Sequence, residues 1–376
     1  MKSNYRYIVK AFMAMAVIAG TTSCDDFLDR EPMSSISPET YYSTAAQLEA
    51  NLNDEYPNVL PSFGQWTYGI FGEDKGTDNQ IEVNANDRYT QDRWKVPHSE
   101  SDNWKFERIY RINFFLSEAL PKFGEDMSGS QNTISGSVAT IKHYIGEMYF
   151  LRAYEYFKKL QLFGDFPIID QPLADEMEAL REASKRFPRN EVARFIISDL
   201  DKAYAYMSDV DMATTRINKD AAMLVKSRVA LFEATWLQNF KGTAFVPGGE
   251  GWPGASLHNN YQYPSGNLDN EVKYFLEQAV EASKLVADKY KGNLTENTGV
   301  LQQSADDPSN PYFDMFAQED LSDVKEVLLW RQYARGLSTH NINAAAGRGN
   351  YRIGLTRGFV QNFLMKDGTP VYAHGS

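Results

Sequence analysis

The stretch FLRAYEYFKKLQLFGDFP, residues 150–167, decides the fold of this chain. Its apolar residues recur at the spacing of an α-helix, and Gly164 and Pro167 are residues that usually end one. The pattern therefore predicts a helix over about 137–163. Ala153 followed by aromatic residues also matches the small-then-aromatic step of a tetratricopeptide repeat, in which a small residue lets the paired helix approach. An ordinary helical hairpin fits this short match about as well.

Helical periodicity recurs in five other segments of the chain. It predicts further helices over about 45–60, 103–122, 190–207, 219–240 and 270–290. A capping box opens the first of these at Thr44, and Asn190 is expected to cap the helix that begins there. Strand signals are few, and the best of them is Glu326–Trp330. The chain is therefore predicted to be mostly α-helical, with long irregular loops and few short strands. Helix pairs joined by turns suggest a tetratricopeptide-like array, with ordinary helical hairpins as the alternative.

Aromatic and charged residues within the helices are expected to serve packing. Tyr and Phe side chains at helical spacing usually form a core. Arg152 is expected to pair with a carboxylate of a neighbouring helix rather than with a ligand. Trp104 and Trp236 are placed on helices and are assigned to packing as well.

Composition limits the classes of function that are open to the chain. At 376 residues it can bury one large core or two modest ones, and its formal charge is -12. Phosphate binding needs clustered Lys and Arg, so nucleic-acid binding is not expected. Because Cys24 is the sole cysteine, no internal disulfide can form and packing must supply the stability. No segment after the N-terminus is long enough to cross a membrane.

The N-terminus has the organisation of a secretory signal peptide that ends just before Cys24. Lys2, Arg6 and Lys10 accompany a short apolar run, and small residues follow it. A cysteine that becomes the first residue after cleavage is the lipid acceptor in bacterial lipoproteins. The sequence therefore predicts a lipoprotein signal peptide over 1–23, with lipid attached to Cys24. The alternative is cleavage nearby that leaves an unpaired thiol, an arrangement that exported proteins tend to avoid.

The sequence contains no catalytic constellation. The five histidines are scattered, and none has the i, i+4 spacing of a zinc-binding helix. The chain has no Walker-type phosphate loop and no nucleophile elbow. Its carboxylates are abundant, as in any acidic protein, and they predict no glycosidase pair. The chain is therefore interpreted as a binding protein, not an enzyme, with no cofactor and no metal.

Aromatic residues in loops are the candidates for ligand binding. They lie in stretches rich in Gly, Asn and Pro, where no helix face accounts for them: Trp66, Trp94, Trp252, Tyr261 and Tyr263. A sugar ring has one apolar face and a rim of hydroxyls, so an aromatic side chain can stack on the face while polar side chains bond the rim. The alternative for each is a small hydrophobic cluster that pins a long loop. Tyr333, Arg335 and Tyr351 are weaker candidates.

Several segments resemble, in family order, the SusD/RagB family of outer-membrane nutrient-binding lipoproteins. The most specific is 150–167, which is similar to the family's hallmark helix and its Phe-Gly-Asp-x-Pro exit. Further segments that match are 24–29, 37–42, 103–113, 217–236 and 359–370.

The resemblance also implies a division of the chain into parts. A signal peptide over 1–23 precedes a helical tetratricopeptide-like domain over 24–240, and a RagB/SusD C-terminal domain begins within 241–376. In the family the chain continues well past the landmark Lys366-Asp367-Gly368, with further helices. We therefore expect this chain to be a C-terminally truncated form in which the second domain is incomplete.

The resemblance implies a function as well. Members of this family bind glycans, starch among them, through loop aromatics outside the helical array. Trp94 falls in the corresponding loop of this chain. Asn86 and Arg88 are near it in sequence and could bond the hydroxyls at the rim of the sugar. The protein is expected to be lipid-anchored in the outer membrane and to face the cell surface. It would capture oligosaccharide and deliver it to a SusC-like, TonB-dependent outer-membrane transporter.

Rival functions remain open on the sequence alone. A peptide-capturing, RagB-like member of the same family would need grooves that bond a peptide backbone instead of stacking platforms. A secreted glycoside hydrolase on a helical scaffold would release product. A pure tetratricopeptide adaptor would leave the long aromatic loops without a purpose.

Overall fold

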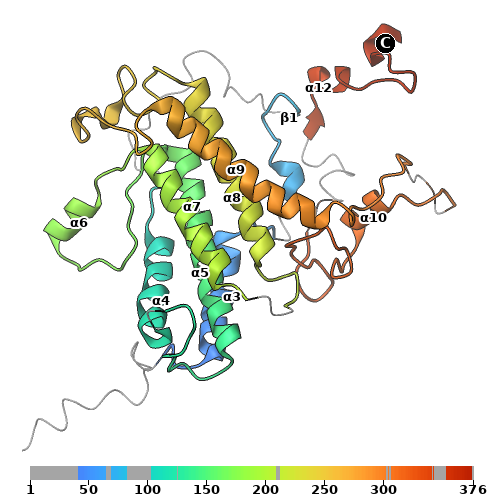
Figure 1. Ribbon diagram of the computed structural model, residues 1–376. Coiled ribbons are helices and arrows are strands. Elements are labelled where there is room, and N and C mark those ends of the chain that lie inside the picture. The colour runs from blue at the N-terminus through green and yellow to red at the C-terminus, as the bar shows by residue number, and fades with distance from the viewer. Residues whose placement is uncertain are drawn as a thin grey trace, which may run out of the picture.

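The computed structural model describes residues 41–64, 69–82, 103–124, 126–208, 212–301, 304, 306–340, 342 and 353–374. Within these residues the chain is mostly helical, as Figure 1 shows, so the predicted fold class is confirmed. The long helices are α3 (Ala45–Val59), α4 (Glu107–Phe123), α5 (Val138–Phe163), α7 (Arg189–Tyr206), α8 (Lys219–Asn239) and α9 (Leu268–Tyr290). Among the helices described, none combines the length and the apolar character that a membrane span requires.

Shorter elements occupy the connections and the region after α9. The helical ones are α6 (Met177–Ala183), α10 (Pro311–Ala317), α12 (Arg357–Gln361) and the 3-10 turns η1 (Gly69–Gly72), η3 (Pro253–Ser256) and η4 (Val371–His374). Strand β1 (Gln80–Glu82) pairs antiparallel with β2 (Ile353–Leu355). Because Gln80 lies opposite Leu355, this small sheet joins segments that are far apart in the sequence.

The long helices pack as a sequential array. Both α3 and α4 pack on α5, α5 packs on α7, α7 on α8, and α8 on α9 (Figure 1). Helix α5 has neighbours on opposite sides, so Ile141, Tyr149 and Leu160 are all buried. Where α5 meets the end of α7, a Cβ on Gly146 would lie 2.8 Å from the backbone nitrogen of Met207. That position therefore admits no side chain, and the glycine sets how closely the two helices approach.

The helix ends show which sequence signals acted as predicted. The capping box is confirmed, because Thr44 Oγ1 accepts from the Gln47 amide at 3.3 Å and Gln47 Oε1 accepts from the Thr44 amide at 3.0 Å. Gly164 follows α5 with a φ of 67°, a conformation that glycine adopts freely. Asp165 then accepts a hydrogen bond through Oδ1 from the Arg189 amide at 2.9 Å, at the first turn of α7.

The prediction that Asn190 caps α7 is wrong. The N-cap residue is Pro188, and Asn190 lies inside the first turn. Its side chain is buried and its Nδ2 donates to Glu271 Oε1 at 3.1 Å. An Asn at a helix start usually predicts a local cap, but here Asp165, more than twenty residues earlier, accepts from this turn.

Two other local predictions are also wrong. Within the described residues, Glu326–Trp330 forms no strand, since the Trp330 amide donates to the Thr214 carbonyl outside any sheet, at 3.2 Å. Trp104 lies just before α4 and not on it. It nevertheless packs as expected, with its ring centroid 4.9 Å from the rings of Phe163 and Phe166.

The expected partner of Arg152 is confirmed. Its Nε and Nη2 donate to the two carboxylate oxygens of Asp199 on α7, at 2.7 and 2.8 Å. Its Nη1 donates to Asn113 Oδ1 on α4 at 2.9 Å. Both members of the ion pair are buried, so this guanidinium joins three helices inside the array.

Candidate functional site

Many of the residues predicted for the site lie outside the described residues. They are Cys24, Trp66, Asn86, Arg88, Trp94 and the weaker candidate Tyr351. Lipid attachment to Cys24 and ligand contact by the others therefore stay predictions.

The structure brings three of the loop aromatics, Trp252, Tyr261 and Tyr263, into one cluster. The rings of Trp252 and Tyr261 are 5.6 Å apart, and those of Tyr261 and Tyr263 are 5.2 Å apart. Trp252 is only 4% exposed, and its indole donates to Asp165 Oδ2 at 2.7 Å. This is the geometry of a cluster that pins the loop between α8 and α9 to the end of α5. Ligand contact through these rings stays a prediction.

The hydroxyls of this cluster are engaged with protein. Tyr261 exchanges hydrogen bonds with the Asn190 amide at 2.9 and 3.1 Å, and Tyr263 donates to the Pro247 carbonyl at 2.6 Å. Burial, followed by the neighbouring carboxylates, raises the pKa of Tyr263 well above its usual value, so its hydroxyl remains a donor.

A cavity of about 590 Å³ lies where the C-terminal end of α3 meets the segment 328–333. Its lining combines aromatic, amide, guanidinium and apolar groups: Asn53, Tyr56, Pro57, Leu60, Pro61, Thr215, Leu329, Trp330, Arg331 and Gln332. Trp330 and Tyr56 are half-buried, and Asn53 and Arg331 are exposed. The cavity therefore offers aromatic rings with polar side chains around them, in the size range of small-molecule sites.

Two hydrogen bonds hold the segment 328–333 against the start of α8 and the connection before it. Asn218, the N-cap residue of α8, donates through Nδ2 to the Leu328 carbonyl at 2.6 Å. The indole of Trp330 donates to Thr214 Oγ1 at 2.8 Å. This bond occupies the polar edge of the indole and leaves its faces for packing or ligand contact.

A second set of bonds joins the segment to the residues after α3. Tyr333 accepts through its hydroxyl from the Phe63 amide at 3.2 Å and donates to the Phe63 carbonyl at 3.1 Å. Arg331 donates through Nη1 to Ser62 Oγ at 2.5 Å. The walls thus come from parts of the chain about 270 residues apart. The weaker candidate Tyr333 joins the segment 328–333 to Phe63, and it is not among the residues that line the cavity.

The α3 wall is fixed from behind by a buried charge network. Tyr56 donates through its hydroxyl to Glu147 Oε2 at 2.6 Å and accepts from the Ile217 amide at 2.9 Å. Arg216 donates to both Glu147 oxygens, at 3.0 and 2.8 Å. Burial, followed by the charge of Glu147, raises the pKa of Tyr56 well above its usual value, so the hydroxyl stays protonated and remains a donor.

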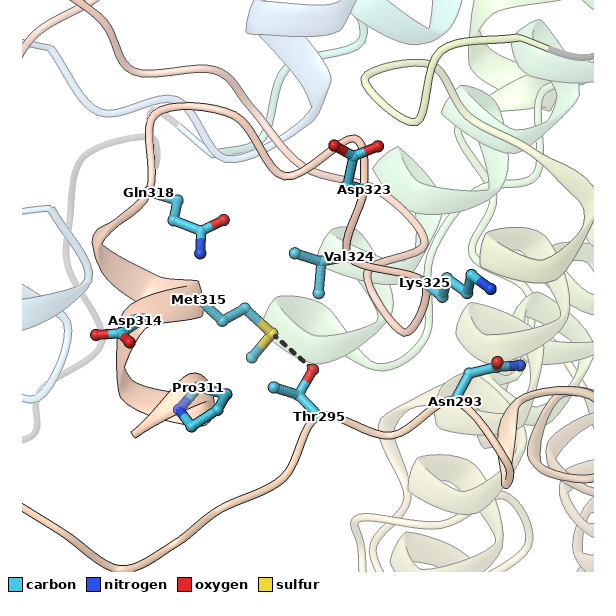
Figure 2. Close-up of a pocket in the computed structure, with 9 residues that line it drawn as sticks. All are labelled: Asn293, Thr295, Pro311, Asp314, Met315, Gln318, Asp323, Val324 and Lys325. Atoms are coloured by element: carbon cyan, nitrogen blue, oxygen red, sulfur yellow. Dashed lines mark hydrogen bonds between the residues drawn. The ribbon is translucent and has the colours of Figure 1, made fainter. Parts of the chain in front are cut away.

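A second cavity, of about 400 Å³, lies beside α10 and has a different character. Figure 2 shows Met315 and Val324 at its centre, with Asn293, Gln318 and Asp323 around them. The Thr295 hydroxyl donates to the Met315 sulfur at 3.9 Å. No aromatic residue is among the described residues that line it, so the cavity at Trp330 is the better fit to a sugar ring. No group of three or more His, Cys, Asp or Glu in the described part of the chain is placed to hold a metal ion.

Trp330 was missed as a site residue on the sequence. The run Val327-Leu328-Leu329-Trp330 has the composition of a strand, and this composition predicts packing rather than a site. The signal that points to a site is the change after it, where Arg331, Gln332 and Tyr333 place polar and aromatic groups in a stretch without helical periodicity.

Comparison with known proteins agrees with the observed helical fold. A family model described as SusD-like, starch-binding associating with outer membrane, matches residues 26–231, more than half of the chain. The chain belongs to the SusD-like family. Two curated relatives of this SusD-like chain come from Formosa agariphila: SusD-like protein P2, 25% identical over 64% of this chain, and SusD-like protein P25, 25% identical over 57% of it. The chain spans 46% and 41% of their lengths.

A solved structure shares the fold. It is a SusD-like carbohydrate binding protein from Bacteroides fragilis, with a TM-score of 0.53 and 15% sequence identity. The match covers 88% of this chain and 55% of that one. At 15% identity the two proteins are similar in fold alone. Because the match covers 88% of this SusD-like chain, the similarity includes part of the region after α9.

Proposed function

We propose that this SusD-like chain binds an oligosaccharide in the cavity at Trp330, on the outer face of an outer membrane. The observation that carries the proposal is the lining of that cavity, in which an indole stands beside Asn53, Arg331 and Gln332. An aromatic face pairs with the apolar face of a pyranose, and amide and guanidinium groups bond its hydroxyls. The family's description as starch-binding supports a glycan as the ligand class.

The proposal includes a partner and a place in uptake. A lipid on Cys24 would anchor the chain, and a SusC-like, TonB-dependent transporter would receive the captured oligosaccharide. The domain over 24–240 would supply the helical scaffold, and 241–376 would supply the Trp330 side of the site. No nucleotide or metal is needed for this task, because the protein binds and releases without making or breaking a bond.

Calorimetric titration tests the binding proposal. Maltohexaose, laminarihexaose, cellohexaose and xylohexaose are titrated into the chain expressed from residue 25, and each mixture is then assayed for cleaved product. We expect saturable heat with at least one hexasaccharide, at an affinity that for a single shallow site is around 1 mM or tighter, about -4 kcal/mol. Steady release of shorter sugars would instead identify a hydrolase, and heat from peptides alone would favour peptide capture.

Replacing Cys24 with Ala should abolish membrane anchoring, because this is the sole thiol to which a lipid could be attached. The measurement is labelling with an alkyne fatty acid in a Gram-negative host with outer-membrane lipoproteins, followed by membrane fractionation. We expect label and membrane association in the parent and neither in Cys24→Ala. Ser23→Ala, which changes the neighbouring residue but keeps the thiol, is the control and should be labelled like the parent. Label retained by Cys24→Ala would overturn the proposed anchor.

A further inference from the structure

Arg216 links the buried core of the array to the rim of the cavity. It lies in the connection before α8, where Nε and Nη2 hold the fully buried Glu147 carboxylate on α5. Its remaining nitrogen, Nη1, donates to Asn53 Oδ1 on α3 at 2.9 Å and makes a longer contact of 3.4 Å with Glu49 Oε1 on the same helix. One guanidinium therefore connects a buried charge with an amide that lines the candidate site.

The guanidinium has little freedom to move. Its Cζ lies 4.9 Å from the ring centre of Tyr144 and 5.5 Å from that of Tyr56. The side chain of Arg216 is only 16% exposed. With a planar fork held by a bidentate carboxylate and flanked by two rings, the direction of Nη1 is fixed.

This fixed donor determines which way the Asn53 amide faces. Arginine can only donate, so the atom of Asn53 that meets Nη1 must be the carbonyl oxygen. The NH₂ group then points away from Arg216, and it has no hydrogen-bond partner among the described residues. Because Asn53 lines the cavity, its wall on the α3 side presents a donor.

We propose that Arg216 is a positioning residue: it orients the Asn53 amide so that its NH₂ donates to a hydroxyl oxygen of the oligosaccharide bound beside Trp330. This inference rests on the proposed function and adds to it the atom that recognises the sugar rim. It also assigns a purpose to Arg216 beyond neutralising Glu147, since two of its nitrogens already do that.

Asn53→Asp tests the inference without disturbing the fold. A carboxylate has the same shape and accepts a stronger, charge-assisted bond from Arg216, but it has no hydrogen to donate. With the hexasaccharide of the panel that binds the parent best, we expect affinity to fall about three- to tenfold, the range of one hydrogen bond. The melting temperature should be unchanged or higher. Asn58→Asp, which adds the same charge to α3 at a residue outside the cavity lining, should bind like the parent.

Arg216→Lys tests whether Arg216 orients Asn53 or only neutralises Glu147. Lysine keeps the charge beside Glu147 but lacks the planar fork that reaches Asn53 at the same time. We expect it to lower affinity by a factor similar to Asn53→Asp, and the double variant to bind no worse than either single one. Losses that multiply in the double variant would overturn the positioning role.

The outcomes distinguish this inference from the proposed function. A parent chain that binds none of the four hexasaccharides overturns the proposed function. A parent that binds, and is weakened by Trp330→Ala but not by Asn53→Asp, keeps the proposed function and overturns the role of Arg216. Weakening by both substitutions, with Asn58→Asp unchanged, supports the two together.

Discussion

Replacing Arg152 with Met should lower the free energy of unfolding by about 3–5 kcal/mol, the cost of leaving a buried charge without its partner. The Asp199 carboxylate is fully buried and takes both of its short bonds from Arg152, whereas the half-exposed Lys202 lies 3.6 Å away and is too distant to replace them. Asn113 would lose a donor as well, so contacts among α4, α5 and α7 weaken together. The measurement is urea denaturation followed by circular dichroism, compared with the parent chain.

An exposed ion pair supplies the matched control for this prediction. Lys241 bonds Asp269 on the surface, where the two side chains are 58% and 73% exposed. Lys241→Met should therefore change stability by less than about 1 kcal/mol. The double variant Arg152→Met/Asp199→Leu removes both buried charges and should recover part of the loss. If Arg152→Met were as stable as Lys241→Met, the buried network would not hold the array together as described.

Trp330→Ala should weaken oligosaccharide binding by about tenfold or more. The indole is the largest side chain in the cavity, and losing a stacking partner together with its buried area costs on the order of 1.4 kcal/mol. For a weak site this is a large share of the total affinity. The loss of the bond to Thr214 should lower the melting temperature only slightly, because it is a single, partly buried hydrogen bond. Calorimetry at 25 °C on the folded variant measures the effect.

Trp236 provides the matched tryptophan for that experiment. It lies on α8, about 25 Å along the helix from the end beside the cavity, and Arg189 stacks on its ring at 4.1 Å. Trp236→Ala should cost stability through lost packing but leave oligosaccharide affinity unchanged. The opposite pattern, with Trp236→Ala weakening binding and Trp330→Ala neutral, would place the site elsewhere on the molecule.

The helical array could be predicted from the sequence because its signals are local. The helix expected over 137–163 is found as Val138–Phe163, since Ser137 caps it and Gly164 ends it, both within a few residues. The ion pair of Arg152 was also predictable in kind, because a charged residue on an apolar helix must find a counter-charge when buried.

The cavity could not be predicted, because its walls depend on contacts between distant residues. Ser62 and Arg331 are 269 positions apart, and no periodicity links them. The apolar neighbours of Trp330 predict a strand, whereas its amide and indole both bond Thr214. The position of Asn190 predicts a cap, although Asp165 bonds that turn from the end of α5. Each of these outcomes was decided by tertiary contacts that override local preference.

The central claim is that the cavity at Trp330 binds oligosaccharide, and a crystal structure of the complex tests it most directly. The chain is crystallised with the hexasaccharide that binds best, and the sugar is placed in difference density. We predict a pyranose ring stacked on the Trp330 indole, with one of its hydroxyls within about 3 Å of Asn53 Nδ2. A sugar bound at any other place, with the cavity filled by water alone, would contradict the account.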